Sequence, residues 1–350
     1  MLKVCVVCYP NYPSKKTGRG QDRYSYELLK QLRLRGIDPI VLEQGTVGNF
    51  LEYAIKDLKI FSKIINIETD LFHAASEYGA KYLFLMKSPV VTTIHDMLPY
   101  FFFSKAPALY FNQRICFRLA SKSDKIIVSS QFYLELVRRI LKVPLEKIRV
   151  IHHGVDHQFF TPIPKNRRVW KDHKIIFYTG GLSRMKGAAT LIRAFSVVAK
   201  EMKDVDLLIG GEGKDFTLLQ TIANRLKIRD RVRFLGFIKE EVLSRYYNLA
   251  DVFVWPSHFG FGLAILEAMA CGTPVIVSNA FDASEYVGDA GILFEPGNVR
   301  QLADSLLYIL ENEDVRRSYS RKAIKRAGLF SWQKTVKETL KVYNELLSTS

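Results

Sequence analysis

One acidic residue, Glu267, interrupts an apolar segment of helical character in the stretch from 254 to 279. The apolar run that ends at Trp255 predicts a buried parallel strand, and Gly260 and Gly262 follow it before the helical pattern begins. A carboxylate in such a helix is costly to bury without hydrogen-bond donors. A vicinal diol such as a ribose would offer two hydroxyl donors to the two carboxylate oxygens. The alternative is a buried glutamate paired with an arginine or with backbone amides.

A second glycine-containing segment separates a predicted strand at 175–179 from a long helix predicted from Ala188. It contains Gly180 and Gly181, and Lys186 follows shortly before the helix. Backbone amides, the positive end of the helix dipole and the lysine charge together suit a diphosphate. The segment is not a Walker A loop, because G-x-x-x-x-G-K-[ST] is absent. The alternative is a structural or solvated loop lysine.

His95 directly follows the β-branched run 90–94, where a parallel strand is predicted to end. Open α/β sheets bind ligands at that end of their strands, so His95 is a candidate site residue. The alternative is a hydrogen-bonded histidine beside a helix cap. Gly18 and Gly20 precede a helix predicted at 24–35, and their amides would face an anion or a sugar. A dinucleotide-binding turn is disfavoured, because Arg23 occupies the third position of G-x-G-x-x-G.

Length and composition limit the class of protein. A chain of 350 residues is long for a single core and predicts two domains. The apolar and charged fractions, 48% and 25%, are typical of soluble globular proteins. No apolar run reaches 18 residues, so no membrane span is expected, and the start of the chain reads as a first strand rather than a secretory leader. Cys5 and Cys8 have CxxC spacing but would face opposite sides of a strand, and Cys116 and Cys271 are isolated. Four reduced thiols in a cytoplasmic protein are therefore expected.

The charge of the chain is unevenly distributed. Residues 1–150 contain 23 Lys and Arg against 13 Asp and Glu, a net charge of +10, and the remaining residues carry +6. The excess indicates an anionic partner, namely nucleic acid, an acidic membrane surface or a phosphorylated substrate, or else a solvated basic surface. Nucleic acid is disfavoured, because no nucleic-acid-binding module is recognisable. The aromatic and basic segment 100–119 indicates a patch for lipid or for a long acceptor, or a helix with its aromatic side chains packed inward.

The segment around Glu267 resembles the most specific motif of the retaining glycosyltransferases of family 4, the glycosyl transferases group 1 superfamily. That motif, a Glu, seven residues and a second Glu, lies in a segment like E-G-F-G-L-x-x-L-E-A-M-A-x-G-T-P-V. Residues 260–263 and 266–275 match it, and Phe259 stands in place of the first Glu. The family segments T-x-H-D and V-S-x-x…I-x-V-I-x-N-G-V-D resemble residues 93–96 and 125–156.

A further family motif, G-R-x-x-x-x-K-G, matches at Lys186 and Gly187, while Gly181 stands at the position of the Arg. Arg184 is therefore a candidate substitute for that arginine. The pair Asp204 and Asp206 has the D-x-D form of metal-dependent transferases, but it precedes a predicted strand rather than ending one. We interpret it as strand entry and expect no bound divalent metal.

The resemblance extends over about residues 1–347 and implies the GT-B fold. This is an α/β architecture of two Rossmann-like domains facing across a cleft. It implies an acceptor-side domain of residues 1–160 and 331–350, a linker at 161–173, and a nucleotide-sugar-binding domain at 174–330. The last helix, to about Leu347, is expected to cross back onto the first domain.

The resemblance also implies an activity, which is transfer of a sugar from a nucleotide-diphosphate sugar to an acceptor hydroxyl with retention of configuration. No cofactor is expected. The residues expected to act on the diphosphate, the ribose and the transferred sugar are Lys186, Glu267 and His95. The residues expected to bind the donor are Gly18, Gly20, Gly180, Gly181, Arg184, Gly211, Gly260, Phe261, Gly262 and Leu263.

The expected partners are the nucleotide sugar, a glycan or lipid-linked acceptor and, peripherally, an anionic membrane at its cytoplasmic face, with no nucleic acid. Phe259 and Gly181 remove charged groups that the family uses. A catalytically weak or inactive nucleotide-sugar-binding protein is therefore the alternative.

Overall fold

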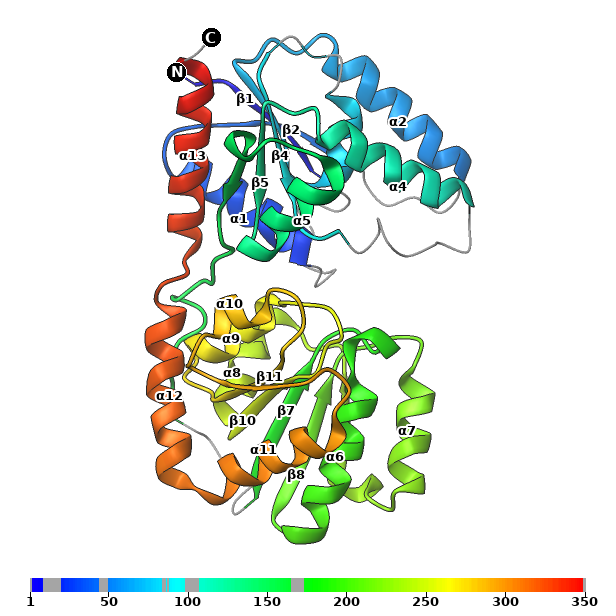
Figure 1. Cartoon of the computed structure of the whole chain (residues 1–350), viewed down its shortest axis with the longest axis vertical. Helices are drawn as coiled ribbons and strands as arrows, with labels where there is room; N and C mark the ends of the chain where they lie inside the picture. Colours follow the sequence, from blue (N-terminus) through cyan, green and yellow to red (C-terminus); the bar gives the residue numbers. More distant parts are fainter. Residues whose placement is uncertain are drawn as a thin grey trace. The chain divides into compact units, whose positions relative to one another are not determined.

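The computed structural model describes residues 2–8, 20–43, 50–83, 86, 88–97, 107–164 and 173–348, with the backbone alone at 20, 21, 50–54 and 107–111. The chain forms two compact units. The first consists of Met1–His153 and Trp332–Ser350, and the second of Gly154–Ser331. Each unit contains one six-stranded sheet (Figure 1). The prediction of an α/β chain with two Rossmann-like units is confirmed.

The sheet of the first unit has the strand order β2-β1-β3-β4-β5-β6, and every neighbouring pair is parallel. Its strands are β1 (Val4–Cys8), β2 (Ile40–Glu43), β3 (Leu71–Ala74), β4 (Val90–Ile94), β5 (Lys125–Val128) and β6 (Ile148–Val150). Parallel strands need crossover connections. These are α1 (Gly20–Arg33), α2 (Phe50–Ile64), the 3₁₀ helix η1 (Glu77–Tyr82), α4 (Pro107–Ala120), and α5 (Gln131–Leu141) followed by the short 3₁₀ turn η2 (Leu145–Lys147).

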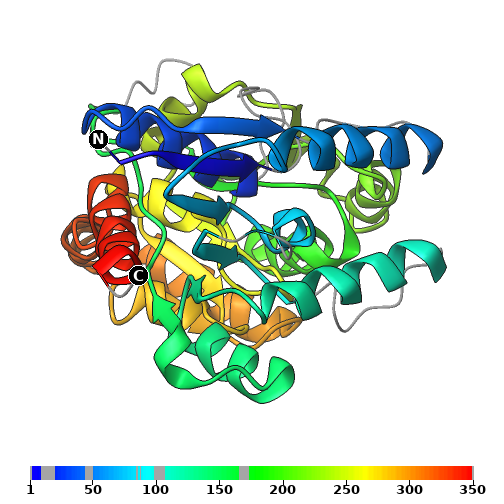
Figure 2. The same ribbon diagram turned by 90° about the horizontal axis from the view of Figure 1, so that it is seen from above.

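The last helix, α13 (Trp332–Ser348), packs against α1 in the first unit. Thr335 donates to the carbonyl of His152 at 2.8 Å, and the Glu345 carboxylate meets Lys125 at 2.5 Å and Arg149 at 2.7 Å. Figure 2 shows α13 on one side of this sheet and α2 and α4 on the other. Right-handed crossovers from β2 to β3 and from β4 to β5 place α2 and α4 on the same side. The predicted return of the last helix onto the first unit is confirmed.

The sheet of the second unit has the order β12-β11-β10-β7-β8-β9 and is also parallel throughout. Its strands are β7 (Lys174–Thr179), β8 (Val205–Gly210), β9 (Val232–Gly236), β10 (Val252–Trp255), β11 (Val275–Ser278) and β12 (Ile292–Phe294). Its helices are η3 (Arg184–Lys186), α6 (Ala188–Glu201), α7 (Phe216–Arg225), η4 (Arg229–Arg231), α8 (Glu240–Leu249), α9 (Leu263–Ala270), α10 (Ala283–Val287), α11 (Val299–Glu311) and α12 (Glu313–Ala327).

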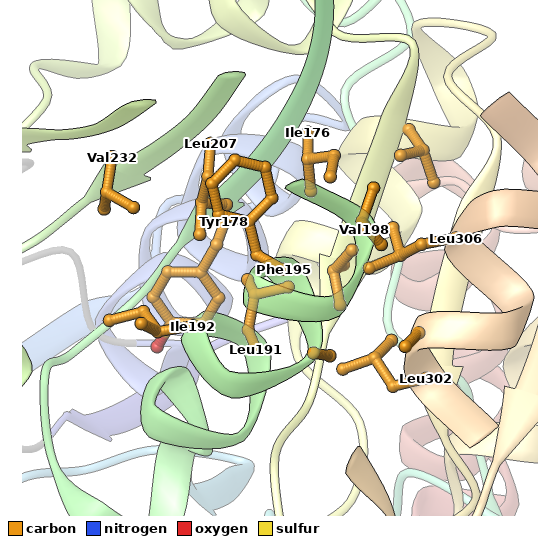
Figure 3. Close-up of a cluster of buried hydrophobic side chains, with 14 of the residues drawn as sticks. Ile176, Tyr178, Leu191, Ile192, Phe195, Val198, Leu207, Val232, Leu302 and Leu306 are labelled. Carbon is orange, nitrogen blue, oxygen red and sulfur yellow. The ribbon is translucent and has the colours of Figure 1, made fainter. Parts of the chain in front are cut away.

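Alternation along β7 divides the core of the second unit between the two faces of its sheet. Ile176 and Tyr178 pack with α6 and α11, and Figure 3 shows Phe195 and Leu306 in that cluster. Ile175 and Phe177 belong to the other cluster, with α8 and α9. A strand buried on both faces must be apolar at successive positions. The continuous run 175–178 meets that requirement.

The Ser130 hydroxyl accepts from the amide of Tyr133 at 3.3 Å and caps the first turn of α5. Two boundaries predicted from the sequence need adjustment. The helix predicted from 24 begins at Gly20. The first unit ends at His153 rather than near 160, because Val155 and Phe160 pack in the core of the second unit. Within the predicted linker, residues 165–172 lie outside the described residues.

Candidate functional site

The strand order of the second unit indicates where a ligand would bind to its sheet. Strands β7 and β10 are neighbours, but the chain leaves β7 toward β8 and leaves β10 toward β11, on opposite sides. In open α/β sheets, such a switch point leaves a crevice beyond the carboxyl ends of the two strands, where ligands bind. Residues 180–187 follow β7 and residues 256–262 follow β10. Most of the predicted donor-binding residues therefore lie at this switch point.

The two loops at the switch point contact each other through the backbone. The amide of His258 donates to the carbonyl of Met185 at 2.9 Å. Gly187 has a φ of +74°, and a Cβ placed there would lie 1.9 Å from the carbonyl oxygen of Pro256. Only glycine tolerates both the left-handed backbone and this approach. The loop that contains Lys186 is thus fixed against the loop that leads to Glu267.

Trp255, at the end of β10, organises the side chains of both loops. The ammonium of Lys186 lies 5.1 Å from the centroid of its ring, within cation–π range. The indole N–H donates to the carbonyl of Gly260 at 3.0 Å. A Cβ on Gly262 would lie 2.4 Å from the indole, and one on Gly180 would lie 3.3 Å from it. The glycines leave room for the ring that positions the lysine.

The remaining predicted donor residues of the first loop lie beside Lys186. Gly181 is exposed, and the space where its side chain would stand is open. Arg184 is exposed in η3, two residues before Lys186. Gly211, at the end of β8, has a φ of +116°, and its Cβ would lie 1.9 Å from the carbonyl oxygen of Gly180. Arg184 is thus an exposed second cation near Lys186. It lies in the same loop as Gly181, the residue that stands in place of the family arginine.

The loop that follows β10 is fixed by Asp282, which precedes α10. The Asp282 carboxylate accepts from the amide of Phe261 at 2.9 Å, and it occupies the space where a side chain on Gly260 would stand. The Phe261 ring stacks on Tyr286 with a centroid distance of 3.6 Å. Leu263 is the first residue of α9, and the N-cap residue Gly262 supplies no side-chain cap. The first turn of α9 therefore depends on other groups for its amides.

Glu267 lies on the buried side of α9 and is 9% exposed. The hydroxyl of Tyr247, which is fully buried on α8, donates to Glu267 Oε2 at 2.8 Å. The sequence-based alternative anticipated a paired buried carboxylate, but with an arginine or amides as partner. The Tyr247 hydroxyl is one partner of the carboxylate, because α8 and α9 pack on the same face of the sheet.

In the first unit, His95 follows β4 and is nearly buried. Its Nε2 lies 2.8 Å from the carbonyl oxygen of Ala75, so Nε2 must carry the proton. Its Nδ1 is then the acceptor for His153 Nε2, at 3.4 Å. The backbone amide of His95 donates to the carboxylate of Glu77, which is fully buried after β3. His95 is thus hydrogen-bonded within the protein, as the alternative interpretation anticipated.

A polar chain continues behind His95 through the core of the first unit. His73 contacts the Thr93 hydroxyl at 2.8 Å and the Tyr343 hydroxyl at 2.5 Å, and Tyr24 contacts Thr93 at 3.0 Å. Burial lowers the pKa of His95 to about 4, and burial together with the neighbouring His95 lowers the pKa of His73 to about 3. Burial also holds the pKa of His153 well below its usual value. These imidazoles are neutral at pH 7.

Two further predictions concern positions elsewhere in the chain. Gly20 begins α1, and Gly18 lies outside the described residues. Asp206 lies within β8 and accepts from His173, the residue before β7, at 2.8 Å. Across the described residues, no three His, Cys, Asp or Glu side chains are grouped to hold a metal ion. In the same part of the chain, no helix has both the length and the apolar character to cross a membrane.

Sequence reasoning missed Trp255, Tyr247, Asp282 and His153. The first three hold the predicted residues in place through contacts with other elements. His153 had a local signal, because it stands at the Asn of the I-x-V-I-x-N-G-V-D segment. Its contact with His95 joins residues 58 positions apart. A single sequence does not report such contacts.

Two doubly wound parallel units, one with glycine loops and a lysine at its switch point, define a protein of the GT-B class. Residues 160–326 match the family described as Glycosyl transferases group 1, and residues 18–159 match Glycosyltransferase Family 4. The chain belongs to this family and is a glycosyltransferase of the family 4, GT-B type.

Some individual proteins are similar to nearly the whole chain. O-antigen chain mannosyltransferase B from Escherichia coli is 25% identical over 97% of this chain and all of the relative. Sucrose-phosphate synthase from Thermosynechococcus elongatus has the same fold, with a TM-score of 0.87 and 22% identity over the full length of both chains. Anabaena Alr3699/HepE, solved in complex with UDP-glucose, gives a TM-score of 0.79 and 22% identity, also over the full length of both.

The neutral imidazoles of the first unit make its stability depend on pH. Histidines with a lowered folded-state pKa bind protons more readily in the unfolded chain, so their contribution is complete above pH 6.5 and is lost as the pH falls toward 4. Protonation would lower the free energy of unfolding by roughly 2 kcal/mol at pH 5 for each of His95 and His73. We expect amides of β3 and β4 to lose hydrogen-exchange protection between pH 7.5 and 5, after correction for intrinsic rates. His153→Asn should reduce this loss. Equal losses in wild type and variant would contradict the account.

Proposed function

We propose that this glycosyltransferase moves a sugar from a nucleotide-diphosphate sugar to an acceptor hydroxyl with retention of configuration and without a divalent metal. The observation that carries the proposal is the position of Lys186, held over Trp255 at the switch point of the second unit. An ammonium at the carboxyl ends of β7 and β10 suits an anionic ligand. The UDP-glucose bound by Alr3699/HepE is a ligand of this chemical type.

The diphosphate would bind between the glycine loop and the start of α6. The N-cap residue of α6 is Gly187, which offers no side-chain cap, and the helix dipole places partial positive charge at this end. Anions bind at such uncapped helix starts through backbone amides. Lys186 would add a full charge, which stabilises the negative charge that develops on the departing diphosphate. Arg184 is our candidate for the second cation.

The ribose would bind at Glu267. A carboxylate has about four acceptor positions, and the Tyr247 hydroxyl uses one of them. The same hydrogen bond fixes the orientation of the carboxylate, which favours binding of a diol in one geometry. The alternative is that Glu267 serves only the fold through its bond to Tyr247. In that case, its replacement would have no effect on the recognition of ribose hydroxyls.

The acceptor, a glycan or a lipid-linked sugar, would bind to the first unit. His95 is the candidate for orienting the transferred sugar, as a neutral imidazole whose Nε2 proton is directed to Ala75. Of the two hydrogen bonds made by the ring nitrogens of His95, the 3.4 Å bond to His153 is the longer. A sugar hydroxyl would replace this bond at the lower cost. We propose that no divalent metal is needed because the positive charges of Lys186 and Arg184 take the place of a metal cation.

Replacing Lys186 by Ala is the direct test of the donor site. A charge-assisted hydrogen bond contributes about 1.5–3 kcal/mol, so we expect donor affinity to fall about 10- to 100-fold. The measurement is calorimetric titration with UDP-glucose, UDP-N-acetylglucosamine and GDP-mannose, using the donor that wild type binds best. Lys200→Ala, an exposed lysine in the last turn of α6, is the matched control. Unchanged affinity in the Lys186 variant, with the fold intact, would refute the assignment.

A second test separates the two interpretations of Glu267. We expect wild type to bind the ribonucleoside diphosphate about tenfold more tightly than its 2′-deoxy analogue, the difference contributed by one good hydrogen bond. Glu267→Gln should abolish that preference. Tyr247→Phe should keep it while lowering the free energy of unfolding by about 1–2 kcal/mol. If Glu267→Gln discriminates as wild type does, the carboxylate is structural.

Retention predicts the anomeric configuration of the first product. Because the sequence indicates no protein nucleophile, we propose attack on the same face as the departing diphosphate. Proton NMR of product formed from an α-linked donor should show an α-linkage, and mass spectrometry should detect no sugar attached to the protein. A β-linked product would overturn the stereochemical proposal, and a trapped glycosyl–enzyme adduct would overturn the single-step route.

A further inference from the structure

An apolar stripe on the exposed side of α2 is not explained by sugar transfer. Ile55, Leu58 and Ile65 are 45%, 68% and 65% exposed. Their spacing, with Ser62 between them, follows one side of the helix, and the amide of Ile65 continues the helical pattern by donating to the carbonyl of Phe61. Large aliphatic side chains aligned in this way indicate a surface that contacts another apolar phase.

Lysines border this stripe along one edge. Lys59 and Lys63 are exposed, and Lys56 is half-buried. The structure gives Lys59 and Lys63 no carboxylate partner among the described residues. Over residues 55–64, the only acid is Asp57, and it is paired with Lys81 at 2.5 Å. The outward face of the described part of α2 is therefore apolar and positively charged.

The opposite side of α2 is firmly packed. Ile60 is 5% exposed and Ile64 is fully buried in the core of the first unit. Asp57 also accepts from the hydroxyl of Tyr82 on η1, and Phe61 packs edge-on against that ring at 5.2 Å. The exposed stripe therefore belongs to a helix whose opposite side is fixed in the core of the first unit.

On the other side of η1, α4 presents similar chemistry. Its aromatic Phe117 is buried, whereas Arg114, Ile115 and Arg118 are exposed. Both helices pack against η1. Of the two interpretations of residues 100–119, inward packing therefore holds for Phe117, while the arginines remain outside.

We infer that the first unit binds the surface of an anionic lipid bilayer through the exposed face of α2. An amphipathic helix with lysines beside an aliphatic stripe lies in the interface, with the apolar side chains among the acyl chains and the lysines at the headgroups. A second copy of this face would bring lysines against lysines. A nucleic-acid backbone would pair with the lysines but leave the stripe in water. Membrane binding is independent of the donor site, and it would bring the enzyme to a lipid-linked acceptor.

The test is cosedimentation of the full chain with vesicles of phosphatidylcholine containing 30% phosphatidylglycerol, compared with pure phosphatidylcholine. We expect binding to the anionic vesicles alone, and a loss of about tenfold or more in partitioning for Leu58→Glu with Ile65→Glu. Lys59→Gln with Lys63→Gln should weaken partitioning and its salt dependence. Leu218→Glu with Leu329→Glu, at residues 54% and 51% exposed in the second unit, is the matched control and should partition as wild type does.

Every variant should bind the nucleotide donor as wild type does, because none lies at the donor site. The proposal is overturned if wild type ignores anionic vesicles, or if the Leu58 and Ile65 double variant partitions equally well. Analytical ultracentrifugation supplies a further check. If the same double substitution converts a dimer into monomers, the stripe is an interface between copies and the membrane proposal is wrong.

Discussion

The close approach of two backbone segments determines how the candidate donor site is built. The carbonyl of Pro256 occupies the place where any side chain at position 187 would stand, so the loop after β7 and the loop after β10 form one rigid piece. This contact lies at the switch point of the parallel sheet, where the two loops diverge toward opposite halves. Trp255 then fills the space left by Gly180 and Gly262 and supports the ammonium of Lys186. The glycines are needed because an indole and a carbonyl occupy the positions of their missing side chains.

Much of this arrangement could be predicted from the sequence, since it depends on local patterns. Apolar runs such as 175–178 predict strands, and glycines at strand ends predict loops that approach closely. The cap at Ser130 is equally local, because its side chain acts within the first turn of α5. The matching of short motifs placed Lys186 in the segment that follows β7 and Glu267 on the helix that follows β10, and the structure has both elements.

The remaining features depend on contacts between distant parts of the chain. Tyr247 reaches Glu267 because α8 and α9 share a face of the sheet, and His153 reaches His95 because β4 and the segment after β6 end at the same edge of the first sheet. A single sequence contains no record of such pairings. The unit boundary after His153 was displaced for the same reason, since Phe160 follows the first unit in sequence but packs with Tyr247. The exposed face of α2 could be recognised only once the buried face was known.

The central claim is that a nucleotide-diphosphate sugar binds at the carboxyl ends of β7 and β10 in the second unit. Hydrogen–deuterium exchange of the full chain, with and without saturating donor, tests it most directly. The account predicts that protection concentrates in peptides containing residues 179–188 and 255–267, with little change along α7 and α12. Saturated binding that protects other segments and leaves those two loops unchanged would contradict it.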